Sequence, residues 1–257
     1  MTIKKPEEIE KIRQGGKILA QILSQVLKSA KPGIKTIELD ELAEKLIIEA
    51  GGIPSFKHYT SRPGEQPFPS TICSSVNNQL VHTPASDYQL QAGDILSVDI
   101  GMVYPAEGGF YTDMARTIPI GEVSAEAKKI IEVTKKSFDK AVAVIKDGVA
   151  VSAIGKAIED YVNPQGFAIV RSLVGHGVGY EVHEDPRIPN FYDPKYDNII
   201  LKAGMVIAVE PMINTTSPDI KVLNDGWTIV AADGKLCAHH ENTLVVTKKG
   251  FEILTQA

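Results

Sequence analysis

The sequence contains one histidine and four carboxylates whose types and positions suit the binding of divalent metal ions. His176 lies between Gly175 and Gly177, and a glycine has no Cβ to keep the backbone away from whatever the imidazole binds. The carboxylates, which end or interrupt apolar runs, are Asp99, Asp113, Glu210 and Glu241. One imidazole with four carboxylates is an oxygen-rich donor set. It favours a pair of divalent ions over a closed structural zinc site.

Three of the four carboxylates also have an ordinary structural explanation. Asp113 on its own fits an exposed turn residue paired with Arg116, and Glu210 and Glu241 each fit the surface of an edge strand. Asp99 is different because it closes an apolar strand, where a charge is costly unless it is paired or bound to a metal. The occurrence of all of them in one chain with a glycine-flanked histidine favours the metal site.

Asp99 and Asp113 lie on either side of a predicted hairpin turn at residues 105–109. If the hairpin pairs symmetrically, we expect the two aspartates to face each other across adjacent strands, with Cβ atoms roughly 5 Å apart. Two like charges at that separation need a cation between them.

Three further histidines have competing interpretations. His82 follows an apolar pair and precedes a proline by one residue, so it also fits a histidine that caps a turn at a strand end. His239 and His240 stand next to Glu241 but are interpreted as strand residues, with His240 at most supporting a ligand. The local pattern alone therefore gives none of the three a role in chemistry.

The elements that must position these residues follow a repeated order. Apolar residues at helical spacing predict four helices, and short apolar runs predict strands after each pair of helices. The helices are expected at about residues 6–30, 36–50, 124–146 and 152–162. The strands are expected at about residues 70–74, 79–82, 95–100, 110–118, 167–173, 205–210, 227–231 and 243–246.

The restart of this pattern predicts an internal repeat. Several residues of one half superpose on those of the other, namely Gly33 on Gly148, Glu44 on Glu159 and Gly51 on Gly166. We expect the halves at roughly residues 7–120 and 121–250, within a single domain spanning 1–257. Two such halves would place their strands in one sheet under a layer of helices, an α+β fold with a ligand cleft between the halves.

Composition limits the class of protein. The chain has 257 residues and a formal charge of −5, which gives no general electrostatic basis for binding nucleic acid or an anionic membrane. No apolar run reaches transmembrane length, and the first residues lack the apolar core of a signal peptide. Cys73 and Cys237 make no disulfide framework and fit small buried residues, so we expect a cytoplasmic protein and, by default, a monomer.

The ordered motifs resemble those of the methionine aminopeptidase family, type I, within the pita-bread metallopeptidases. They are V-D-I-G (98–101), Asp113, G-H-G-V-G (175–179), H-E-D-P (183–186), V-E-P-M (209–212) and H-E-N-T (240–243). The resemblance runs from about residue 7 to residue 255. It implies a pita-bread fold, in which a curved antiparallel sheet lies under helices and the two halves are related by a pseudo-two-fold axis.

The resemblance also implies roles for particular residues. Five residues would bind two divalent ions (Co, Mn, Fe, Ni or Zn), with Asp113 and Glu241 bridging; they are Asp99, Asp113, His176, Glu210 and Glu241. His82 and His183 would contact the scissile amide or its tetrahedral intermediate, and Glu210 would take the proton of the attacking water. Cys73, Phe68 and Trp227 would line the pocket for a methionine side chain, although Trp227 alone also fits a core residue.

The expected reaction is removal of the N-terminal methionine from nascent polypeptides when the second residue is small, through a metal-bridged hydroxide and possible docking at the ribosome. The chain departs from the family pattern at Thr83 and Val182 and in the loops at 57–67 and 102–109, which look longer than usual. The altered pocket loops keep open the alternative of an Xaa-Pro dipeptidase or aminopeptidase of the same fold. A further alternative is a non-catalytic binding protein on that fold, although such proteins usually lose ligands and this chain keeps all five.

Overall fold

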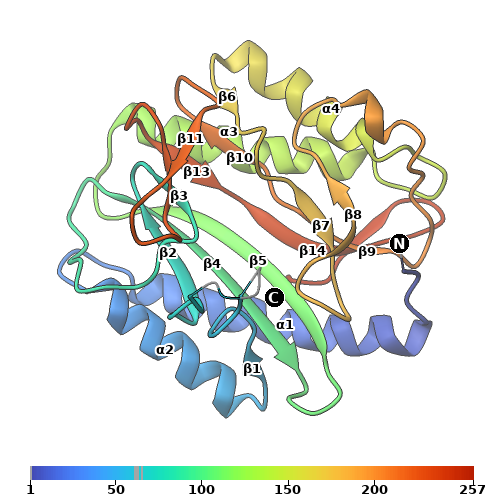
Figure 1. The fold of residues 1–257 in the computed structure, drawn as a ribbon, viewed down its shortest axis with the longest axis horizontal. Coiled ribbons are helices and arrows are strands. Elements are labelled where there is room, and N and C mark those ends of the chain that lie inside the picture. The colour runs from blue at the N-terminus through green and yellow to red at the C-terminus, as the bar shows by residue number, and fades with distance from the viewer. Residues whose placement is uncertain (1, 61–63, 65) are drawn as a thin grey trace.

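Figure 1 shows the computed structural model, which describes residues 2–60, 64 and 66–257. Its helices are α1 (Pro6–Ser29), α2 (Thr36–Glu49), α3 (Ala125–Ala143) and α4 (Ser152–Val162), with short 3-10 turns η1 (Asn163–Gln165) and η2 (Pro194–Tyr196). The strands of the first half are β1 (Ile53–Pro54), β2 (Ile72–Val76), β3 (Gln79–Val81), β4 (Ile95–Tyr104) and β5 (Phe110–Pro119). Those of the second half are β6 (Ala168–Ile169), β7 (Gly175–Gly177), β8 (Glu184–Ile188), β9 (Val206–Val209), β10 (Met212–Asn214), β11 (Ile220–Val222), β12 (Ile229–Ala231), β13 (Cys237–His239), β14 (Glu241–Val246) and β15 (Phe251–Ile253).

The helices begin where local chemistry satisfies their first amide groups. Pro6 opens α1, where a residue without an N–H loses no helical hydrogen bond. Ser124 caps α3, its hydroxyl oxygen accepting from the amide of Ala127 at 3.1 Å. α3 ends at Ala143, slightly short of the predicted end.

One large antiparallel sheet runs through both halves of the chain. Its strands follow the order β1-β4-β5-β14-β9-β7-β8, with β2 also pairing with β4 and β15 with β14. Two smaller sheets, β13-β10-β6 and β11-β12-β3, flank it. The halves meet where β5 pairs with β14, so the middle of the sheet is the junction between them. The α+β fold predicted from the sequence is confirmed.

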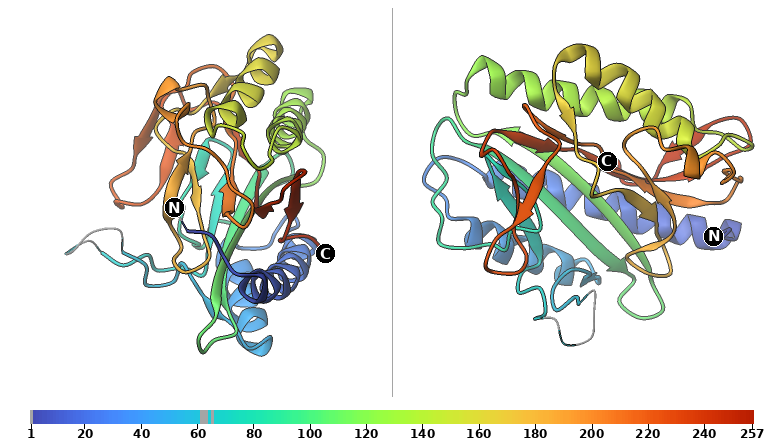
Figure 2. Two further views of the ribbon diagram at one scale, coloured as in Figure 1. Left: turned by 90° about the vertical axis from the view of Figure 1, so that its right-hand side faces the viewer. Right: turned by 45° about the horizontal axis from the view of Figure 1, so that its top comes forward.

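The helices lie together on one side of the large sheet, as the edge-on view in Figure 2 shows. In Figure 1, α1 and α2 lie along the half that contains β4 and β5, and α3 and α4 lie along the other half. The opposite face of the sheet is left to loops and to the small sheets. Helices thus cover one face of the large sheet, and loops and the two small sheets lie over the other.

Each pair of helices packs over its own hydrophobic core. Leu23 of α1 and Ile47 of α2 are fully buried beside strand residues such as Ile100. Phe138 of α3 and Ile158 of α4 belong to a second core with residues of β9, β10 and β14. Burying a side chain of this size contributes roughly 1.5–3 kcal/mol, so both cores hold the sheet that carries the site.

Matched features recur in the two halves of the chain. Gly33 and Gly148 have φ angles of 95° and 84°, and Gly51 and Gly166 have 83° and 80°, so each superposed pair shares a left-handed backbone turn. Both halves also join the second helix to a following segment by an ion pair, Glu44–Lys57 in one and Glu159–Arg171 in the other.

The β4–β5 hairpin corrects one expectation. Asp99 pairs with Ala115, and Asp113 pairs with Gly101, so the two aspartates are diagonal neighbours on one face and do not lie directly opposite. The cause is the turn, because Tyr104 pairs with Phe110 and the hairpin is therefore centred later than assumed. Diagonal neighbours are about 7–8 Å apart at Cα, which leaves room between the carboxylates.

Among the described residues, no helix combines the length and the apolar character needed to cross a membrane.

Candidate metal centre and adjoining pocket

Five neighbouring strands of the large sheet each bring one predicted ligand to the same place. In spatial order, β4 carries Asp99, β5 carries Asp113, β14 carries Glu241, β9 ends immediately before Glu210, and β7 carries His176. These residues are far apart in the sequence, but strands that are hydrogen-bonded neighbours lie about 5 Å apart. The order of strands therefore makes one compact cluster from two separate halves of the chain.

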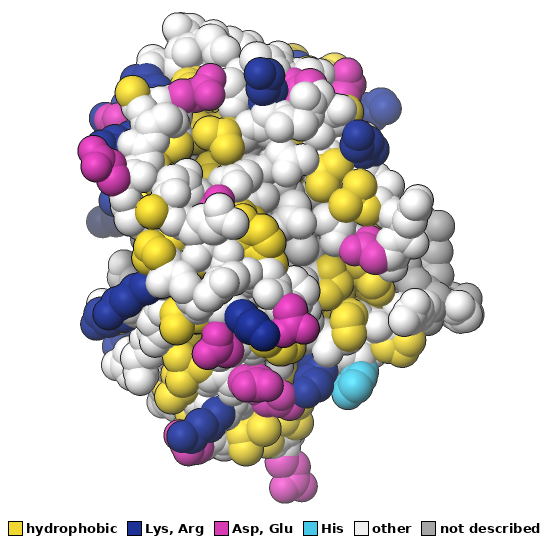
Figure 3. Space-filling model, turned by 90° about the vertical axis from the view of Figure 1, so that its left-hand side faces the viewer, with side chains coloured by type: hydrophobic (Ala, Val, Ile, Leu, Met, Phe, Trp, Pro, Cys, Tyr) yellow, Lys and Arg dark blue, Asp and Glu magenta, His cyan; other side chains and the backbone are white. Residues whose placement is uncertain are grey.

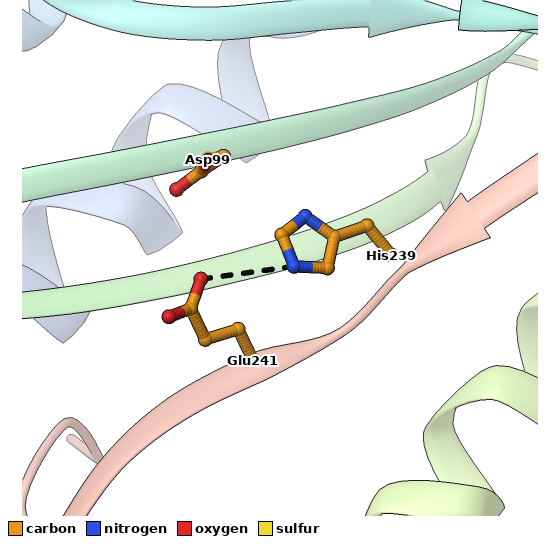
Figure 4. A group of neighbouring side chains, drawn as sticks. All are labelled: Asp99, His239 and Glu241. Atoms are coloured by element: carbon orange, nitrogen blue, oxygen red, sulfur yellow. Dashed lines mark ion pairs between the residues drawn. The ribbon is translucent and has the colours of Figure 1, made fainter. Parts of the chain in front are cut away.

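The ligand atoms of this cluster are close enough to share ions. Atoms of Asp113, His176 and Glu241 all lie within 4.8 Å of one another, and His176 Nε2 is 3.4 Å from Glu210 Oε1. A second group, Asp99, Glu241 and His239, meets the same 4.8 Å limit, and Figure 4 shows the three side chains turned toward one another. Glu241 belongs to both groups, so it stands between the two.

The glycines beside His176 are needed for the close packing of β7 against its neighbouring strands, more than for access to the imidazole. A Cβ added to Gly175 would lie 2.4 Å from the carbonyl oxygen of Ala208 on β9, and one added to Gly177 would lie 2.6 Å from that of Asp185. Such contacts are too short for any side chain. The glycines therefore allow β7 to fit between β8 and β9, which places His176 in the cluster.

The buried carboxylates lack the partners that their charges need. One oxygen of each of Asp99, Asp113 and Glu241 has no hydrogen-bond partner among the described residues, and all three side chains are buried. Buried charges are normally paired or bound to metal. Unpartnered oxygens that converge from adjacent strands are the arrangement that divalent cations would satisfy, so these residues fit a metal centre.

The same burial changes the protonation of the carboxylates. Burial raises the pKa of Asp99 to about 7. Burial, followed by the charges of its neighbours, also raises the pKa of Asp113, of Glu210 and of Glu241 well above the ordinary range. In the absence of cations, the cluster thus holds protons near neutral pH, and cations and protons compete for it.

Burial has the opposite effect on the imidazole. It lowers the pKa of His176 to about 3, so the ring is neutral, and a neutral ring nitrogen is the form that binds metals. Nδ1 of His176 lies 2.9 Å from the carbonyl oxygen of Gly177. If Nδ1 carries the proton and donates to that carbonyl, the lone pair of Nε2 faces the carboxylates.

His183 and His82 lie at the edge of the cluster of candidate ligands. The His183 ring contacts that of His176 edge-on at 4.5 Å between centroids, and its Nδ1 lies 2.9 Å from the hydroxyl of Tyr59. Burial lowers the pKa of His183. His82, which follows β3, has a left-handed backbone with φ 56°, a conformation that side chains other than glycine adopt mainly where other contacts enforce it.

The loop that carries His183 is fastened to the start of the chain. The buried Nζ of Lys4 lies 2.7 Å from Glu184 Oε2, and Glu184 Oε1 also accepts from the amide of Tyr180 at 2.6 Å. Lys4 Nζ lies 4.0 Å from the centroid of the Tyr180 ring as well. Contacts on both sides of His183 thus limit the movement of its loop.

A cavity of about 940 Å³ opens above the cluster and is lined by every predicted site residue. Phe68, Cys73 and Trp227, the predicted pocket residues, lie on one wall, where the rings of Phe68 and Trp227 meet at 5.2 Å between centroids. Burial, with the charges of two nearby aspartates, raises the pKa of the Cys73 thiol, so Cys73 is a neutral sulfur wall. Phe56 and Val182 complete a hydrophobic cluster with them.

The mouth of the cavity borders an exposed apolar segment. Figure 3 shows one side of the molecule, where hydrophobic side chains gather in patches among charges of both signs. Val222, which lines the cavity, and the next residue Leu223 are both exposed. The loop at residues 57–67, which the sequence comparison predicts to be longer than in the family, lies partly outside the described residues.

Comparisons with known proteins assign the family. The model of metallopeptidase family M24 matches residues 10–248. The chain belongs to metallopeptidase family M24. Two curated relatives are a methionine aminopeptidase of Clostridium perfringens, 44% identical over 253 residues, and methionine aminopeptidase 1 of Bacillus subtilis, 45% identical over 253 residues, and each match covers 98% of both chains.

Structural similarity supports the same family. A crystal structure of methionine aminopeptidase from Thermotoga maritima aligns with this M24 metallopeptidase at a TM-score of 0.93 and 37% sequence identity, covering 100% of each chain. The pita-bread fold expected from the motifs is thereby confirmed, and so is the expectation of a metal-dependent hydrolase.

Sequence reasoning gave His239 no role in this metallopeptidase. The structure turns His239 toward Glu241, with Nε2 3.7 Å from Glu241 Oε2, whereas the next residue, His240, packs against Phe138 at 5.1 Å between ring centroids. A signal was available in the spacing of His239 and Glu241, because residues two positions apart in an extended segment lie on the same face. Tyr59 was also missed, since its loop has no periodic pattern.

Proposed function

We propose that this chain is a methionine aminopeptidase that hydrolyses the first peptide bond of polypeptides beginning with methionine followed by a small residue. The observation that carries the proposal is the position of an apolar pocket with a sulfur wall directly beside the cluster of five metal-ligand side chains. An exopeptidase needs both parts within one residue's length of each other. The relatives named methionine aminopeptidase, similar over nearly the whole chain, support the same reaction.

We propose two divalent ions in the cluster, held by Asp99, Asp113, His176, Glu210 and Glu241, with Asp113 and Glu241 shared between them. Asp113 and Glu241 lie on the two central strands, between the Asp99 side and the His176 side of the cluster. Such ions supply a water of lowered pKa and polarise the carbonyl that it attacks. A carboxylate-rich site accepts Co, Mn, Fe, Ni or Zn, and the supply in the cell decides among them.

The remaining steps fall to side chains around the cluster. Glu210 lies at the edge of the ligand cluster, with Oε1 3.4 Å from His176 Nε2, and its carboxylate is proposed to take the proton of the attacking water. If the Tyr59 hydroxyl donates to His183 Nδ1, the proton of the ring is on Nε2, which can donate to the oxyanion or to the leaving nitrogen. His82, held in its left-handed conformation at the cavity wall, is proposed as the second donor.

The proposed methionine pocket is the wall formed by Phe68, Cys73 and Trp227, together with Phe56 and Val182. The nitrogen of the Trp227 ring donates to the carbonyl of Gln66 at 3.1 Å, which fixes the orientation of the ring. A thioether is polarisable and makes favourable contacts with aromatic edges, so this wall suits methionine better than a charged or branched polar side chain.

The test is hydrolysis of Met-Ala-Ser by protein reconstituted separately with Co, Mn, Fe, Ni or Zn, with Leu-Ala-Ser and Ala-Pro as competing substrates. We expect cleavage of the methionyl peptide to exceed that of both others by at least tenfold in kcat/KM. Preference for Ala-Pro would instead show an Xaa-Pro peptidase. A folded protein that binds no metal and cleaves none of the peptides would show a non-catalytic binding protein.

We further propose that the enzyme acts as a cytosolic monomer on nascent chains, near the ribosome. Cys73 and Cys237 are both buried and unpaired, which suits a reducing compartment. Sedimentation with ribosomes from a lysate, at low and moderate salt, tests the association.

A further inference from the structure

His239 is buried beside the candidate ligands Asp99 and Glu241, and neither of its ring nitrogens has a hydrogen-bond partner among the described residues. The side chain is 1% exposed, and both Nδ1 and Nε2 are unpartnered among the described residues. A buried polar group without a partner destabilises the folded state, and an imidazole has two such groups. The position therefore needs something that the neighbouring protein groups do not supply.

The backbone directs this ring toward the cluster. The amide of His239 donates to Thr117 Oγ1 at 2.9 Å, and its carbonyl accepts from the same hydroxyl at 2.8 Å, so the residue is fixed against β5. His240, the next residue, turns to the other face of the strand. The orientation of His239 is thus set by strand geometry and by two backbone hydrogen bonds.

The distances around the ring match those between ligands of one ion. Nε2 lies 3.7 Å from Glu241 Oε2 and 4.0 Å from Glu210 Oε2, too far for hydrogen bonds. Ligand atoms that bind a first-row ion at about 2.0–2.2 Å stand roughly 3–4 Å apart. One ring nitrogen also lies within 4.8 Å of a carboxylate oxygen of Asp99. Figure 4 shows Asp99 and Glu241 on the same side of the His239 ring.

We propose that His239 supplies a second imidazole ligand to the metal centre, on the side held by Asp99 and Glu241. The two sides of the centre then have similar donors. One has His176 with Asp113, Glu210 and Glu241, and the other has His239 with Asp99, Asp113 and Glu241. The inference rests on the proposed metal centre and adds a ligand to it.

A nitrogen ligand on the Asp99 side has a chemical consequence. Imidazole suits Zn, Fe, Co and Ni, whereas a set of carboxylates alone suits Mn and Mg. His239 therefore shifts the preference of that side toward the later first-row ions and makes the second ion harder to remove. Without the ring, the ion would be held by carboxylates only.

The experiment counts nitrogen ligands directly. Apo protein is loaded with two equivalents of Mn(II), and electron spin echo modulation from ¹⁴N is recorded for the wild type, His239→Gln and His240→Gln. We expect modulation from two imidazoles in the wild type and in His240→Gln, and from one in His239→Gln. In a competition with a chelator, the dissociation constant of the weaker Co(II) site should be at least about tenfold higher in His239→Gln than in the wild type.

The outcomes separate the two proposals. If the wild type takes up no metal, the centre itself is wrong and the inference falls with it. If the wild type binds two ions but shows one imidazole, or if His239→Gln keeps the wild-type modulation, the metal centre stands and the role of His239 is overturned. The count in the wild type requires no variant, so a folding defect in His239→Gln leaves the test intact.

Discussion

Removing the metal ions should make the stability of this protein fall steeply as the pH rises above neutrality. Burial raises the pKa of Asp99 to about 7, and burial together with mutual repulsion raises the pKa of Asp113, Glu210 and Glu241 well above the ordinary range. In the unfolded chain these groups ionise near pH 4. Above that pH, the folded apo protein therefore binds more protons than the unfolded chain, and its free energy of unfolding decreases with rising pH.

The buried histidines limit the pH range in which this effect is visible. Burial lowers the pKa of His176 and of His239 to about 3, so the unfolded chain binds more protons at these residues up to about pH 6.5, and stability there rises with pH. The two trends oppose each other below pH 6.5. Above it, the histidines are neutral in both states and only the carboxylates contribute.

The expected size follows from the protons that the folded protein keeps. Each carboxylate that is still protonated in the folded state lowers the free energy of unfolding by about 1.4 kcal/mol per pH unit. Two such carboxylates lower it by roughly 4 kcal/mol between pH 7.0 and 8.5, which is a large share of the 5–15 kcal/mol typical of a domain.

Urea unfolding followed by far-ultraviolet circular dichroism measures this effect. Chelator-treated protein should lose stability between pH 7.0 and 8.5, protein saturated with Co(II) should change little, and apo Asp99→Asn should lose less per pH unit than apo wild type. An apo protein whose free energy of unfolding is flat or rising across that range would refute the reasoning, because the carboxylates would then be ionised without cations.

Three substitutions and one control variant test how the scaffold supports the site. Lys4→Met, which removes the charged partner of the half-buried Glu184, should cost about 1–3 kcal/mol in urea unfolding and lower kcat on Met-Ala-Ser by about tenfold. Gly175→Ala should cost about 1–3 kcal/mol, whereas Gly250→Ala, where nothing lies within 4 Å of an added Cβ, should stay within about 0.5 kcal/mol. His183→Ala should lower kcat by about 10²–10⁴ while elemental analysis shows unchanged metal content.

Each of these expectations has a clear contrary result. A Lys4→Met protein with normal kcat would show that the Lys4–Glu184 contact does not determine the position of His183. Equal stability of the two alanine variants would mean that β7 can shift away from β9, and loss of metal in His183→Ala would make that residue part of the metal centre.

The sequence predicted the elements and the ligand set because their signals are local. The helices over 6–30 and 36–50 have clear periodicity and stop signals, and the carboxylates at 99, 113, 210 and 241 are noticeable because a charge interrupts an apolar run. The family motifs then joined residues that no local pattern connects.

The register and the short strands could not be predicted in this way. The pairing of Asp113 with Gly101 depends on where the hairpin turn is centred, and one residue of error at the turn moves every cross-strand partner. β7 consists of Gly175, His176 and Gly177, whose composition argues against a strand, and only its neighbours β8 and β9 make it one. The ring of His239 was overlooked because His240, next to it, has the same residue type.

Because each of five adjacent strands brings one proposed ligand, the proposed metal centre is complete only after both halves of the chain have been made. Asp99 and Asp113 are translated more than a hundred residues before Glu241, which belongs to both groups of candidate ligands. A growing polypeptide that has folded its first half thus has two aspartates and no place to keep a cation pair. On the proposed function, the chain therefore becomes active in one step, when β14 pairs with β5 and β9 and brings Glu241 to the other candidate ligands.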